Sequence, residues 1–151
     1  MKNFLLTICA FFIFVPLWAQ KVTQEDLQGN WKLVTYIVPG ATLDIVTGKV
    51  TMSEQKNPMD VAVAAKLKAD MESYAPGLSQ AALEIKGNNF YRVFYDVVNN
   101  GPFTIINKTD HQVISASFDD GTTAEIPFRI KDGKLYTTNL EKSKLYIYEK
   151  Q

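Results

Sequence analysis

Two arginines are the residues best suited to bind an acidic group. Arg92 and Arg129 are the only arginines of the chain, against fourteen lysines, and each lies between aromatic or aliphatic neighbours in a strand-like segment. A guanidinium held between apolar walls can bind a carboxylate or phosphate through two parallel hydrogen bonds. The alternative is structural: each arginine pairs with an acid on a neighbouring strand, such as Asp96 or Glu125, or lies over apolar surface. The sequence leaves both interpretations open.

Aromatic side chains form the second candidate set. Tyrosine combines an apolar ring with one hydroxyl, which suits an amphipathic ligand, whereas in an ordinary strand the same ring fills the core. The aromatic residues that we expect to line a ligand site are Tyr91, Phe94, Tyr95, Tyr146 and Tyr148. With the two arginines they are the predicted ligand-binding residues.

Other chemistries have little support in the sequence. The chain has one cysteine, Cys9, and one histidine, His111, which excludes zinc fingers, disulfide scaffolds and Cys–His nucleophilic enzymes. His111 follows Asp110 at a predicted turn, where a surface role competes with that of an axial haem ligand. Neither a nucleophile motif around Ser115 nor a glycine-rich phosphate loop is present. We therefore expect a protein that is not an enzyme and has no metal or cofactor.

Length and charge limit the class of protein. The 151 residues suffice for one domain of ordinary size. Sixteen basic and sixteen acidic residues give a formal net charge of zero, which argues against a nucleic-acid partner. Charged residues at 21% and hydrophobic residues at 46% are typical of a globular chain.

The first nineteen residues have the layout of a secretory signal peptide. Lys2 provides a short positive region, residues 4–17 are almost entirely apolar, and Ala19 offers a small residue for cleavage. The apolar run is shorter than the roughly 20 residues of a membrane-spanning helix, so a stable membrane anchor is not expected. The sequence predicts a signal peptide over 1–19 and a secreted domain over 20–151, periplasmic or extracellular.

The elements that must position these side chains are mostly strands. Turn residues recur every nine to twelve residues after position 82, and the segments between them are rich in Val, Ile, Thr, Tyr and Phe. One turn is expected at Asn100-Gly101. The predicted strands are 31–38, 82–86, 90–98, 103–107, 112–118, 122–130, 135–138 and 144–149. Evenly spaced short strands predict an antiparallel meander, which closes into a barrel or folds as a two-sheet sandwich.

A helix interrupts the long first connection. Asn57-Pro58 is typical of a helix start, and Pro76-Gly77 is expected to end it. The residues predicted to share its apolar face are Met59, Val63, Leu67, Met71 and Tyr74. This helix either acts as a lid over the barrel mouth or covers an outer apolar face. Before it, we expect a helical turn capped by Thr23 and a short hairpin around Thr47-Gly48.

The start of the first strand resembles that of a known superfamily. Gly29-Asn30-Trp31, after one helical turn, is similar to the G-x-W signature of the calycins, and the chain looks most like the small secreted lipocalin-like domains of bacteria. The resemblance implies that Trp31 closes the bottom of the barrel. It also implies an Arg near the chain end that packs on this Trp, but no Arg follows Arg129, and Lys142 or Lys144 would have to replace it.

The chain is also similar, more weakly, to the fatty-acid-binding proteins. Their chains end in a strand reading R-x-Y-E-K, and here Tyr148 matches the Tyr that helps to hold a fatty-acid carboxylate. Tyr146 stands where that family has Arg, so the charge-binding role does not carry over.

These observations predict an all-β fold, an eight-stranded antiparallel up-and-down barrel with one α-helix in the long first connection. The first function hypothesis is a secreted binding protein for a small apolar or amphipathic molecule that enters the mouth opposite Trp31. The alternative is a filled, ligand-free barrel that acts as an interaction or inhibitor module for a secreted partner protein. Fold resemblance alone does not decide between them.

Overall fold

A computed structural model describes residues 21–53, 60–139, 141 and 143–151. The predicted signal peptide, the helix start at Asn57-Pro58 and Met59 lie outside the described residues. Twelve elements follow along the chain: α1 Gln24–Leu27, β1 Gly29–Val38, β2 Ala41–Asp44, β3 Val50–Met52, α2 Val61–Leu78, β4 Ala82–Lys86, β5 Asn89–Phe94, β6 Val97–Asn107, β7 Gln112–Ser117, β8 Thr123–Lys131, β9 Lys134–Thr138 and β10 Leu145–Lys150.

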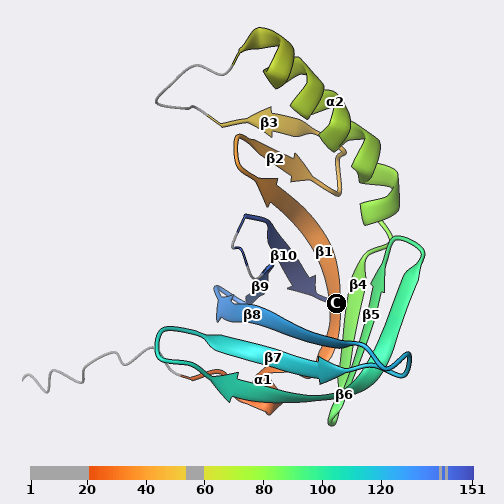
Figure 1. Cartoon of the computed structure of the whole chain (residues 1–151), viewed down its shortest axis with the longest axis vertical. Helices are drawn as coiled ribbons and strands as arrows, with labels where there is room; N and C mark the ends of the chain where they lie inside the picture. Colours follow the sequence, from red (N-terminus) through yellow and green to blue (C-terminus); the bar gives the residue numbers. More distant parts are fainter. Residues whose placement is uncertain (1–20, 54–59, 140, 142) are drawn as a thin grey trace, which may run out of the picture.

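Eight strands close into an antiparallel barrel, as the sequence predicted (Figure 1). β4 to β10 follow one another in chain order, and β1 completes the ring by pairing with β4 on one edge and with β10 on the other. Trp31 is the pairing partner of Leu83 on β4 and of Lys150 on β10. Because the β1–β10 pairing joins the two ends of the sheet, the fold is a barrel and not a two-sheet sandwich.

β1 extends beyond the barrel and carries a second, smaller unit. Gly29 to Lys32 pair with β4, whereas Thr35 to Val38 pair with β2, after an irregularity between Leu33 and Thr35. We call β2, β3 and α2 the wing. In Figure 1 the wing rises from the barrel along the end of β1 and gives the molecule a crescent outline. The predicted hairpin around Thr47-Gly48 is confirmed as β2 and β3.

The N-terminal turn closes one end of the barrel. Thr23 caps α1 in a capping box with Asp26, as predicted, and Leu27 is fully buried beneath it. Trp31 is 2% exposed, and its indole Nε1 donates a hydrogen bond of 2.8 Å to the carbonyl oxygen of Leu27. The ring therefore anchors the turn over the barrel floor, as the calycin resemblance implied.

The backbone conformation and the packing at position 29 explain why the G-x-W pattern has a glycine there. Gly29 has a φ of +123°, and a Cβ at this position would lie 2.8 Å from Cε of Lys150. This space lets the Lys150 side chain reach Trp31, with Nζ 5.4 Å from the ring centroid. The cation beside the tryptophan is thus Lys150 and not Lys144, while Lys142 lies outside the described residues.

One predicted turn is wrong. The chain reverses at Tyr95-Asp96, between β5 and β6, and Asn100-Gly101 lies inside β6. A Cβ on Gly101 would lie 1.9 Å from the backbone oxygen of Ser117, so this glycine permits close approach of two chain segments. An Asn-Gly pair has the composition of a turn, but here close packing determines its position.

The helix differs from its prediction in its end and in its buried face. Asp60 caps α2, and the helix continues through Pro76 and Gly77 to Leu78. Met71 is buried and Leu67 partly buried, as predicted, but Val63 is 55% exposed. α2 packs mainly on β2 and β3, so its contact face follows this hairpin more than the barrel.

Gly77 of α2 leaves room for Tyr95 in the turn between β5 and β6. The Tyr95 ring lies so close to Gly77 that a Cβ there would be 2.3 Å from the ring.

In the described ranges, no helix has the length and apolar composition needed to cross a membrane.

Candidate ligand-binding site

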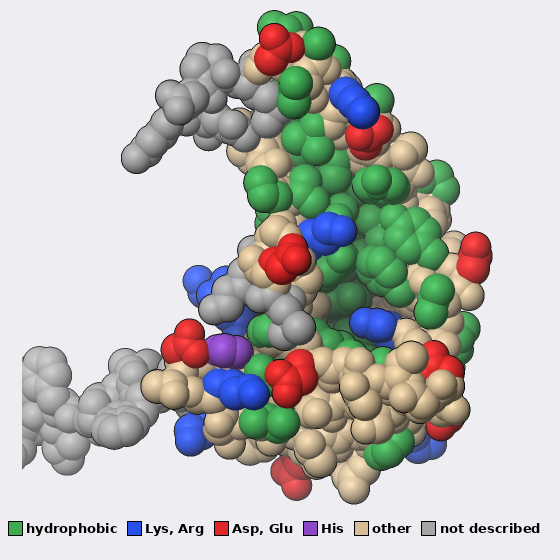
Figure 2. All heavy atoms as spheres, in the orientation of Figure 1, with side chains coloured by type: hydrophobic (Ala, Val, Ile, Leu, Met, Phe, Trp, Pro, Cys, Tyr) green, Lys and Arg blue, Asp and Glu red, His purple; other side chains and the backbone are tan. Residues whose placement is uncertain are grey.

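A cavity of about 380 Å³ lies in the barrel, beyond the end that α1 closes. Its lining includes the ends of β5, β8, β9 and β10 that lie away from α1. It also includes Leu83 and Phe90, which lie deeper in the barrel. Figure 2 shows a hollow in this face of the molecule, with hydrophobic side chains gathered between the wing and the barrel. Cavities from about 300 Å³ upward are typical of small-molecule sites.

Four of the predicted ligand-binding residues line this cavity. They are Arg92, Phe94, Tyr146 and Tyr148. Residues two apart on a strand share a face, so Phe90, Arg92 and Phe94 point together into the barrel. None of the described residues that line the cavity belongs to α2, and the predicted lid residues Val63, Leu67 and Met71 therefore lie elsewhere.

The structure does not bring the other predicted residues to the cavity. Tyr91 lies on the outer face of β5 beside a second pocket, of about 350 Å³, that includes Lys32 and Glu84. Tyr95 packs its ring on Gly77 of α2. Arg129 is exposed, with Cζ 5.0 Å from the centroid of the Tyr136 ring. The structural alternative raised for the arginines thus describes Arg129, which lies over an apolar surface.

Arg92 is the cationic group of the cavity, and Asn99 positions it. Its Nη2 donates a hydrogen bond of 2.7 Å to Oδ1 of Asn99, which is 7% exposed. The guanidinium carbon lies 5.7 Å from the centroid of the Phe118 ring. Nε is buried, and none of the described residues accepts a hydrogen bond from it. A buried donor left in this way is costly unless another group pairs with it.

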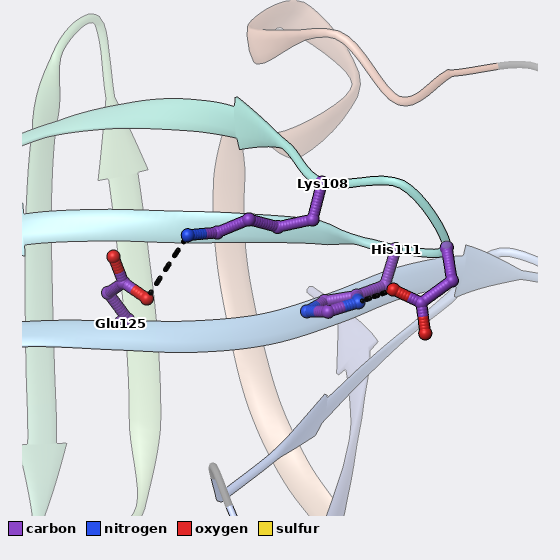
Figure 3. Close-up of polar contacts among 4 residues, drawn as sticks. Lys108, His111 and Glu125 are labelled. Atoms are coloured by element: carbon purple, nitrogen blue, oxygen red, sulfur yellow. Dashed lines mark hydrogen bonds and ion pairs between the residues drawn. The ribbon is translucent and has the colours of Figure 1, made fainter.

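A carboxylate in the lining, that of Glu125, is paired with another cation. Glu125 is among the cavity residues, but its Oε2 lies 3.6 Å from Nζ of Lys108. Figure 3 shows Lys108 reaching across β7 toward Glu125 on β8. The ion pairs found among the described residues do not include Arg92. Glu125 is therefore paired with Lys108, and it forms no ion pair with Arg92 among the described residues.

Three aromatic rings meet at the mouth. Phe94 packs edge-on against Tyr146 at a centroid distance of 5.4 Å, although β5 and β10 are not neighbours in the barrel. Tyr36 stacks on Tyr146 with the ring centroids 5.1 Å apart. The rings thus join three strands across one side of the opening.

Asn99 was not among the predicted residues. Asn99 could have been found only from the pairing register, because it is the partner of Arg92 across β5 and β6. Tyr36 lies on the same strand face as Trp31 only because the irregularity after Leu33 shifts the register of β1.

Tyr148 is expected to make the folded protein less stable at alkaline pH. It is 3% exposed, and burial raises the pKa of its hydroxyl well above the usual value of 10.0. The native state therefore keeps a proton that the unfolded chain loses, so stability is intact below pH 10 and falls as pH rises further. We expect a loss of about 1 kcal/mol per pH unit above pH 10 from this group.

The measurement is urea unfolding between pH 9 and pH 11.5. Tyr148→Phe should have a shallower pH dependence than the wild type, even if its stability at pH 8 is lower. Equal slopes for the two proteins would show that Tyr148 titrates normally in the native state.

His111 lies outside this site. Its Nδ1 contacts Oδ1 of Asp110 at 2.5 Å in the turn after β6 (Figure 3). Within the part of the chain that the structure describes, no group of three or more His, Cys, Asp or Glu side chains could hold a metal ion.

The fold, and not a relative of known function, is the basis for interpreting this site. No family model, no curated protein and no solved structure matches this chain. The closed eight-stranded antiparallel barrel, with its floor closed by Trp31, is consistent with a calycin-like fold.

Proposed function

We propose that this chain is a secreted lipocalin-like binding protein, periplasmic or extracellular, that holds a small apolar or amphipathic molecule in its barrel. In this proposal the protein is not an enzyme, and the signal-like residues 1–19 direct its export. The observation that carries the proposal is the cavity of about 380 Å³ whose lining includes four aromatic rings and the cationic group of Arg92. A completely filled barrel, as the alternative hypothesis requires, would leave no such space.

The position of the cavity supports binding from the mouth. The floor is occupied by Leu27, Trp31 and Phe90, each no more than 2% exposed, so a ligand has no path from that end. At the other end Phe94 and Tyr146 are only partly buried. Apolar walls supply the affinity for the body of a ligand, and the few polar groups orient it.

Filling the cavity tests the proposal. Ala124 lines it and is the pairing partner of the fully buried Ala116. In Ala124→Trp the indole would occupy the cavity, and the affinity for the uncharged fluorescent probe phenylnaphthylamine should fall at least about tenfold, because the probe loses its apolar contacts. The measurement is fluorescence titration of the purified domain.

The matched control is Ala65→Trp on the exposed part of α2, which adds the same ring outside the barrel. This variant should bind the probe as the wild type does. A wild type that binds no probe, or an Ala124→Trp variant that stays folded and binds as tightly as the wild type, would contradict the proposal.

A further inference from the structure

We infer that Asn99 makes the cavity selective for an anionic ligand, because it fixes Arg92 without neutralising the positive charge. This inference rests on the proposed function and names the class of ligand, an apolar body with one carboxylate or sulfonate group. Asn99 is a specificity-determining residue that acts through Arg92, so it is a positioning residue.

The first step is geometric. Arg92 and Asn99 are directly paired across β5 and β6, and both side chains point into the barrel. The hydrogen bond of 2.7 Å from Nη2 to Oδ1 holds one end of the guanidinium against the wall. The Phe118 ring, 5.7 Å from the guanidinium carbon, limits its movement on another side. The Arg92 side chain is therefore oriented before any ligand arrives.

The second step concerns charge. A carboxamide accepts the same hydrogen bond as a carboxylate, but it carries no net charge. An Asp at position 99 would form a buried ion pair with Arg92, and the cavity would then be nearly neutral. With Asn at this position and with Glu125 held 3.6 Å from Lys108, the positive charge stays available to the cavity.

The third step concerns the donor that remains. Nε of Arg92 is buried, and no described residue pairs with it. Thr137 and Tyr148 lie in the same lining, and neither is a carboxylate. A ligand group that carries negative charge would balance the guanidinium. A neutral apolar ligand would leave that charge unbalanced.

Two probes that differ by one anionic group test this inference. Anilinonaphthalene sulfonate and phenylnaphthylamine share an aromatic body, and only the first has a sulfonate. We expect the wild type to bind the sulfonate probe at least about tenfold more tightly than the neutral probe, the usual size of a charge-assisted hydrogen bond. Dissociation constants are measured by fluorescence titration at fixed ionic strength.

The decisive variant is Asn99→Asp, because the aspartate side chain has almost the same shape as that of asparagine. Its affinity for the sulfonate probe should fall at least about tenfold, while its affinity for the neutral probe changes less than about twofold. Arg92→Gln should remove the preference for the sulfonate in the same way and serves as the second variant if Asn99→Asp does not fold. Arg129→Gln removes the same charge on the outer surface, and we expect it to keep the preference.

The outcomes separate this inference from the proposed function. If both probes bind in the cavity, as their loss of affinity in Ala124→Trp shows, but Asn99→Asp and Arg92→Gln leave their affinity ratio unchanged, the inference is wrong and the binding function stands. If the wild type binds neither probe, both fail. A selective loss of sulfonate binding in Asn99→Asp and Arg92→Gln supports the inference.

Discussion

Replacing Trp31 with Ala is expected to lower the free energy of unfolding by about 3–5 kcal/mol, the usual cost of removing a buried aromatic ring. Trp31 is 2% exposed, and three contacts depend on its indole. Nε1 holds the carbonyl of Leu27, the ring fills the floor of the barrel, and the Lys150 ammonium lies over its face. The substitution removes the ring that joins α1, β1 and β10.

Urea unfolding of the purified domain, followed by circular dichroism, measures this loss. Trp31→Phe keeps much of the apolar volume but not the hydrogen bond to Leu27, so its cost should be clearly smaller than that of the alanine variant. A loss below about 1 kcal/mol for Trp31→Ala would mean that the floor packs well without the ring, contrary to the usual cost. The calycin-like interpretation of Gly29 and Trp31 would then have no energetic support.

Gly101→Ala should be almost as damaging, although it adds one methyl group. Gly101 is buried in β6, and a Cβ there would lie 1.9 Å from the carbonyl oxygen of Ser117. The obstacle is backbone, which cannot rotate away as a side chain can, so β6 and the end of β7 must separate. We expect a loss of about 3 kcal/mol, the upper part of the range for overpacking in a core.

Gly133→Ala is the matched control for this prediction. Gly133 has a φ of +73°, and nothing lies within 4 Å of the added Cβ. Its substitution therefore costs only the left-handed backbone conformation, about 1 kcal/mol. Urea unfolding of both variants measures the difference. An equal or smaller loss for Gly101→Ala would show that the close approach to Ser117 is easily relieved.

The barrel could be predicted because its information is local and repeated. Turn residues and β-branched segments at regular spacing set the number of strands, and antiparallel neighbours need no long connection. The turn between β5 and β6 was placed wrongly, because Asn100-Gly101 has the composition of a turn whereas Tyr95-Asp96 does not. Gly101 allows the close approach to the Ser117 backbone, and that approach depends on the pairing of β6 with β7.

The candidate site was predictable only in part for a similar reason. Alternation shows that Phe90, Arg92 and Phe94 share one face, but both faces of β5 carry large apolar groups, so the inward face could not be chosen. On β8 the inward residues are Ala124, Ile126 and Phe128, which leaves Arg129 outside. Only the closed ring, which brings β5 opposite β10, decides which arginine belongs to the cavity.

The helix shows how a partner element overrides an amphipathic pattern. The predicted apolar face included Val63 and Tyr74, which are 55% and 42% exposed. α2 rests on the two-stranded hairpin of the wing, and so narrow a sheet covers only a narrow stripe of the helix, centred on Leu67, Met71 and Leu78. The sequence could not indicate how wide the surface beneath the helix would be.

The pairing of β1 with β10 also governs how the chain reaches its native state. These strands come from opposite ends of the described chain, and Trp31 meets Lys150 only when everything between them is in place. Contacts of such long sequence separation slow folding, because the entropy of loop closure must be lost before they form. During synthesis β1 emerges first and keeps one unpaired edge until β10 follows. The slowest folding step should therefore be ring closure, and the partly folded chain should be most prone to aggregation just before it.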